Sequence, residues 1–134
     1  MTYSLRKTIQ AYLETKHPRV YFKRAPEIEV FPYIVFDLDP SFTPDEAREQ
    51  LTITVDGWDS PTYGDSAALE TLMELINGDG ALDAPSGLDK QAIQSNDLLA
   101  IFRLDSRSAP DDEDPAILRR TYTYDTTIFE RRTS

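Results

Sequence analysis

Regular alternation of apolar and polar residues over positions 50–58, QLTITVDGW, restricts the fold of this chain more than any other feature. Successive side chains of a β-strand point to opposite faces of the sheet. One face carries Leu51, Ile53 and Val55, and the other carries Thr52, Thr54 and Asp56. An antiparallel strand with one covered and one wet face has this pattern. Residues 118–132, LRRTYTYDTTIFERR, alternate in the same way, with Tyr122, Tyr124 and Ile128 opposite Thr121, Thr123, Asp125 and Thr127.

The remaining segments predict two helices and further strands. Helical spacing of apolar residues indicates amphipathic helices over 4–16, ending before Pro18, and over 66–77, capped by Asp65 or Ser66. Strands are expected at 20–22, at 32–38 and over 91–104 with an interruption near 95–97. Pro32 has no N–H and fits only at a strand start or an edge.

This order predicts an α+β fold for the single domain 1–134. We expect a mainly antiparallel four- to five-stranded sheet with two helices packed on one face, because no series of βαβ units is present. Residues 105–116, DSRSAPDDEDPA, are expected to form a flexible acidic loop.

Charge is distributed unevenly along the chain, whose formal net charge is −10. Basic residues gather in segment 1–24 and after Ile117, and the middle of the chain is acidic. An acidic protein repels phosphate, which disfavours binding to DNA. Two faces of opposite sign would suit head-to-tail packing of identical subunits; an unevenly charged soluble surface is the alternative.

Cysteine is absent, which excludes disulfides and thiolate chemistry. The apolar runs are too short to cross a bilayer, and the first ten residues lack the apolar core of a signal peptide. We therefore expect a protein that is made in a cytoplasm and has no membrane partner.

Signals for catalysis are weak. His17 is the only histidine and follows the first expected helix, where it would stabilise the helix end. Asp37 and Asp39 lie on one side of a strand, so they either bind Mg²⁺ or Ca²⁺ or stand in solvent where the strand leaves the core. The run Asp111, Asp112, Glu113 and Asp114 lacks the ligand spacing of an EF-hand. The interpretation is a protein that is not an enzyme and has no cofactor, metal or catalytic residue.

Several short motifs resemble one family of structural proteins. The motifs are Val20-Tyr21-Phe22, Ala25-Pro26, Phe31-Pro32-Tyr33-Ile34-Val35, the strand from Leu51 to Trp58, and Arg119 to Ile128. In this order the chain resembles the tail-terminator (tail-completion) proteins of long-tailed bacteriophages and prophages. The resemblance implies a ring, usually a hexamer, at the head-proximal end of the tail tube. Such a ring stops tube polymerisation and provides the joint to the head–neck connector or stopper protein.

The resemblance also implies a location in the virion neck after assembly in the bacterial cytoplasm, with DNA only as passing cargo in the ring lumen. Candidate interface or lumen residues are Arg19, Lys23, Arg24, Asp37, Asp39, Asp45, Glu46, Trp58, Tyr63, Asp111, Asp112, Glu113, Asp114, Arg119 and Arg120. We hypothesise that one acidic stretch, 37–49 or 105–114, faces the lumen and keeps DNA from adhering. Trp58 and Tyr63 either anchor an interface or cap the edge of the core. The alternatives are another neck component, such as a head-completion or stopper protein, and a metal-dependent enzyme using Asp37 and Asp39.

Overall fold

Two helices and six strands form the part of the chain that the computed structural model describes, which comprises residues 2–24, 30–40, 48–61, 66–81, 83–94, 98–110 and 116–130. In chain order the elements are α1 (Thr2–Glu14), β1 (Val20–Phe22), β2 (Tyr33–Pro40), β3 (Arg48–Asp59), α2 (Ala67–Asn77), β4 (Ala92–Gln94), β5 (Leu98–Ser108) and β6 (Leu118–Glu130). The α+β class predicted from the sequence is confirmed.

All six strands belong to one sheet in the order β1-β2-β3-β6-β5-β4. β1 pairs with β2 in parallel, and the other neighbours pair antiparallel. The prediction of four to five mainly antiparallel strands is therefore wrong: the sheet is mixed and has six strands. Where one interrupted strand was predicted over 91–104, the chain has two strands, β4 and β5, which pair antiparallel. β2 runs in the same direction as β1, which makes this pair parallel.

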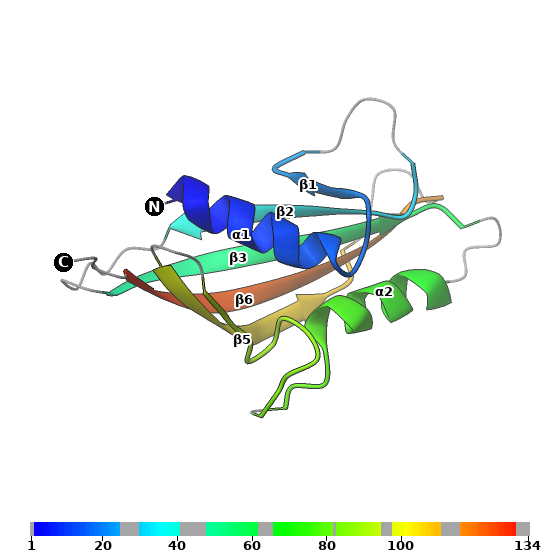
Figure 1. Cartoon of the computed structure of the whole chain (residues 1–134). Coiled ribbons are helices and arrows are strands. Elements are labelled where there is room, and N and C mark those ends of the chain that lie inside the picture. Colours follow the sequence, from blue (N-terminus) through cyan, green and yellow to red (C-terminus); the bar gives the residue numbers. More distant parts are fainter. Residues whose placement is uncertain are drawn as a thin grey trace.

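Both helices cover one face of the sheet, and Figure 1 shows them on the same side of it. α1 contributes Leu5, Ile9 and Leu13 to the core, and α2 contributes Leu69, Leu72, Met73 and Ile76. These side chains share one core with alternate residues of the strands, among them Phe36, Ile53, Val55, Phe102 and Tyr124. Burial of these apolar side chains away from water is the main stabilising contribution to the fold.

The loop that follows α2 returns to close the end of the helix. Gly78, with a positive φ of 84°, follows the last helical residue, as the sequence Asn77-Gly78 indicates. The Leu88 N–H donates to the Ile76 carbonyl at 2.7 Å, and the Asp89 N–H donates to the Asn77 carbonyl at 2.9 Å. The last carbonyls of α2 thus gain partners from twelve residues further along the chain.

Two local expectations change in the structure. β5 continues to Ser108, so the acidic loop predicted at 105–116 begins later than expected; its residues 111–115 lie outside the described part of the chain. The expectation for Pro32 does not change, because β2 begins directly after it and lies between β1 and β3. The second change concerns the start of α2. Ser66 occupies the N-cap position of α2 without a side-chain capping hydrogen bond.

Candidate functional site

The face of the sheet opposite the helices, called the open face here, is mainly polar and presents the predicted aspartate pair, and Ile101 and Phe129 are exposed on it as well. Asp37 and Asp39 are both exposed on this face, because residues two apart in β2 share a side. The Oδ1 of Asp37 accepts the Leu38 N–H at 2.8 Å. Within the described residues, no group of three or more His, Cys, Asp or Glu side chains is placed to hold a metal ion.

An aromatic and charged cluster occupies one end of the open face. The rings of Tyr33 and Trp58 stack with centroids 6.2 Å apart, and the Arg119 guanidinium lies 4.7 Å from the Trp58 centroid. Arg119 is fixed by an ion pair of 3.1 Å to Asp56, whose carboxylate also accepts the Thr121 hydroxyl. This fixed, half-buried arrangement packs Trp58 on the open face; its role as an interface anchor stays a prediction.

The basic residues predicted near the N-terminus have different surroundings. Arg19 Nε and His17 Nε2 both donate to the Pro32 carbonyl, at 3.0 Å and 2.8 Å. Arg19 therefore holds the chain before β1 against the start of β2. Lys23 and Arg24, by contrast, are exposed directly after β1. The structure thus separates one structural arginine from two basic side chains that are available to a partner.

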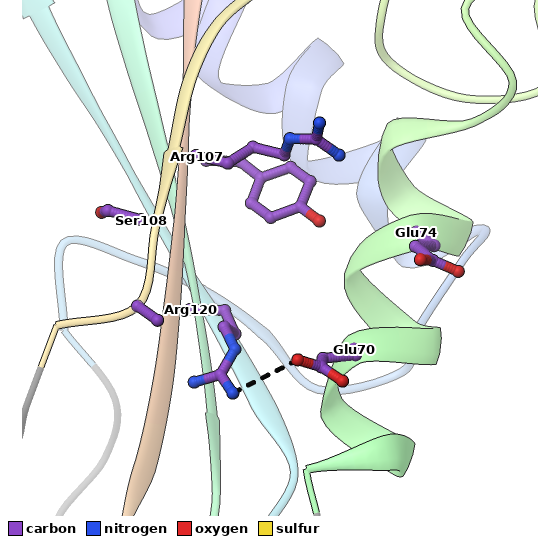
Figure 2. A pocket seen from close by; sticks show the side chains of 7 residues that line it. Glu70, Glu74, Arg107, Ser108 and Arg120 are labelled. Atoms are coloured by element: carbon purple, nitrogen blue, oxygen red, sulfur yellow. Dashed lines mark hydrogen bonds and ion pairs between the residues drawn. The ribbon is translucent and has the colours of Figure 1, made fainter.

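A groove lies between α2 and the ends of β5 and β6. It has a volume of about 410 Å³ and is lined by Glu70, Glu74, Arg107, Ser108, Ala109, Arg120 and Tyr122 (Figure 2). Arg120 spans it to Glu70 at 3.4 Å and also donates to the Arg119 carbonyl at 2.9 Å. The Arg107 guanidinium lies 5.8 Å from the centroid of the Tyr122 ring.

Sequence reasoning identified Arg120 but missed Arg107, Glu70 and Glu74. A register shift between Leu104 and Ser106 explains the miss for Arg107. Without this β-bulge, alternation from Leu104 would place Arg107 on the open face; with it, Arg107 pairs with Tyr122 and points to the helix side. The two glutamates lie on the exposed side of an amphipathic helix, where the sequence gives no reason to single them out.

Seven of the fifteen predicted interface or lumen residues lie outside the described part of the chain: Asp45, Glu46, Tyr63, Asp111, Asp112, Glu113 and Asp114. The other eight do not form one site. Arg19 lies before β1, and the other seven divide among the open face, the end of β1, the aromatic cluster and the groove.

A second tight network stabilises the loop after α2. The Asp79 carboxylate accepts the N–H groups of Ala81 at 3.1 Å and Ser86 at 3.2 Å. These backbone hydrogen bonds, that of Ala81 first, hold the pKa of Asp79 below its ordinary value. The network orders a surface loop and gathers no group with evident chemistry.

No helix in the described residues has the length and apolar character needed to span a bilayer.

The sequence matches no family model and no curated protein. Comparison of the fold with solved structures does find likenesses. One is to a chain from a structure described as the virion of a native gene transfer agent particle, with a TM-score of 0.68, 12% identity, and coverage of 96% of this chain and 99% of that chain. Another solved structure, whose name states no function, is 13% identical with a TM-score of 0.57 and covers 97% of this chain and 92% of its own. At these identities the likeness establishes a shared fold over nearly the full length of each chain.

Proposed function

We propose that this protein is a structural component of a phage-like virion, and specifically a tail terminator. It would form a ring, usually of six subunits, on the head-proximal end of the tail tube and join the tube to the head–neck connector. The observation that carries the proposal is the full-length likeness to a chain of a gene transfer agent virion. The motif resemblance described above supports the narrower assignment, and it comes from the sequence independently of the fold.

The surface is compatible with this role in two respects. A closed ring of identical subunits needs two different, complementary surfaces on each subunit. The charged end of β1 and the groove beside α2 lie on different sides of the molecule and differ in composition. The open face carries the hydroxyls of Thr52, Thr54 and Thr123 and the exposed carboxylate of Asp125, and none of these groups would grip the phosphates of passing DNA.

Assembly with tail tubes tests the proposal. Purified protein should bind one end of tubes, appear as a ring in electron microscopy and stop further addition of tube protein. Tubes that continue to grow at the normal rate in the presence of excess protein would contradict termination. Binding to the isolated connector with no binding to tubes would favour the alternative of a head-completion or stopper protein.

A channel-lining role for the open face is a separate part of the proposal. Thr54 and Thr123 are paired neighbours on β3 and β6, so replacing both by lysine creates a basic patch on this face. The double variant should assemble normally but release DNA more slowly, because each added cation can neutralise a phosphate. Thr71→Lys on the exposed side of α2 adds charge elsewhere and serves as the control. Normal release from the double variant would argue against a lumenal open face.

A further inference from the structure

Two charged surfaces lie at opposite ends of a single row of paired residues across the sheet. The row runs through Phe36, Val55, Tyr122 and Arg107, each paired with the next. At the β2 end, the Lys23 N–H donates to the Phe36 carbonyl at 2.9 Å. Lys23 and Arg107 therefore lie at the same level along the strands. Three strand spacings separate β2 from β5, which is about 14 Å across the sheet.

The first surface, called the charged corner, consists of Lys23, Arg24, Asp37 and Asp39. All four side chains are exposed, and within the described residues none of them forms an ion pair. The Arg24 N–H donates to the Phe22 carbonyl at 2.9 Å, and Lys23 has a φ of +69°. A positive φ is uncommon for lysine and here closes a tight three-residue turn. This turn carries two cations past the end of β1, where the Lys23 Nζ lies 5.7 Å from the centroid of the Phe22 ring. Asp37 and Asp39 lie on the open face of the neighbouring β2, so this edge of the sheet presents charges of both signs.

The second surface is the groove beside α2. Arg120 and Glu70 neutralise each other there at 3.4 Å. Arg107 and Glu74 line the same groove, are exposed, and form no ion pair within the described residues. Figure 2 shows Arg107 on the strand side and Glu74 on the helix side. The groove therefore presents one unmatched cation and one unmatched anion on opposite walls.

We infer that the charged corner of one subunit docks in the groove of the next, with Asp37 reaching Arg107 and Lys23 reaching Glu74. The inference rests on the proposed ring and names its subunit contact. A second copy of this chain suits the groove because its charged corner carries both signs, whereas a purely anionic ligand such as DNA would leave Glu74 unmatched. Since the two surfaces are different, the contact is heterologous. A heterologous contact produces a closed ring where its rotation closes on itself, as the proposed ring requires.

Crosslinking tests this contact directly, since the chain contains no cysteine. The double variant Asp37→Cys/Arg107→Cys is assembled on tail tubes and treated with a short bismaleimide. We expect a ladder of covalent oligomers that ends at the number of subunits in the ring. The matched control is Asp37→Cys/Arg103→Cys, because Arg103 is an exposed arginine of the same strand that instead pairs with Asp125. The control should give no ladder.

Charge reversal provides a second measurement. Arg107→Glu or Asp37→Arg alone should lower the efficiency of ring assembly by roughly tenfold, because like charges then meet at the contact. Combining the two substitutions should restore most of the loss, and Arg103→Glu should leave assembly unchanged.

The outcomes separate this inference from the function on which it rests. Rings that form normally without a crosslinked ladder, or losses that add in the combined variant without rescue, would overturn the contact and leave the tail-terminator proposal standing. Wild-type protein that forms no ring on tubes would overturn both.

Discussion

Replacement of Gly87 by alanine should destabilise the protein strongly, because two backbone segments touch at this glycine. A Cβ at position 87 would overlap the backbone of Asn77 and Gly78. Backbone cannot move aside as a flexible side chain can, so the loop would have to withdraw from the end of α2. We therefore expect the contacts that depend on this close approach to be lost together.

The structure sets the size of the effect. Withdrawal breaks the hydrogen bonds from Leu88 and Asp89 to the end of α2, which contribute about 1 kcal/mol each. It also partly exposes Leu88, which is now fully buried, at a further cost of about 1–2 kcal/mol. The sum is about 3–4 kcal/mol, a large share of the roughly 5–15 kcal/mol by which a domain is stable. The melting temperature should fall by about 10–15 °C.

Urea unfolding followed through Trp58, the only tryptophan, would measure this loss. Gly80→Ala is the matched control in the same loop. A Cβ at Gly80 would contact a side-chain atom of Asp89 at 3.2 Å, and its φ of 69° is unfavourable for alanine, so we expect a loss of about 1 kcal/mol. If Gly87→Ala loses no more than Gly80→Ala, the argument from backbone overlap is refuted.

Two further substitutions test individual interactions. Burial raises the pKa of Tyr124 well above its ordinary value, so its hydroxyl stays protonated and donates to Asn77 Oδ1 at 2.8 Å. Tyr124→Phe should therefore lower the free energy of unfolding by about 1 kcal/mol in the same urea assay, and no loss would show that water replaces the bond fully. The lowered pKa of Asp79 means that its ionised form stabilises the fold at neutral pH, and this contribution is lost as the pH falls below the ordinary value of 3.8. Asp79→Asn should thus make stability fall less steeply on acidification; an unchanged slope between neutral and strongly acidic pH would contradict this assignment.

The elements of the fold could be predicted where one residue pattern has one physical solution. The alternation in β3 and β6 needs a sheet with one covered face, and the buried residues of α2 are those that share a helical stripe. Pro32 was predicted at a strand start or an edge, and β2 begins at the next residue, Tyr33. These predictions depend on contacts near in sequence or on a simple repeat, which is why they hold.

The pairing of strands that are distant in the chain could not be predicted as well from the sequence. Nothing local in Val20–Phe22 specifies that β1 joins β2 in parallel, since a three-residue strand has the same alternation in either direction. The sequence also favoured a loop from residue 105, where pairing with β6 extends β5 to Ser108. Hydrogen bonds to a long partner strand outweighed a local composition rich in serine and aspartate.

The sequence by itself determined the α+β class, the amphipathic faces and the presence of exposed carboxylates at Asp37 and Asp39. Only the tertiary structure decided which charges share a surface. Arg107 joins Glu74 in a groove because a bulge reverses the alternation of β5. Lys23 lies at the same level as Arg107 because the three strands between them, β2, β3 and β6, pair in register. The physical reason is that a residue's type fixes its charge and hydropathy, whereas its neighbours across a sheet depend on register, which is set by long-range pairing.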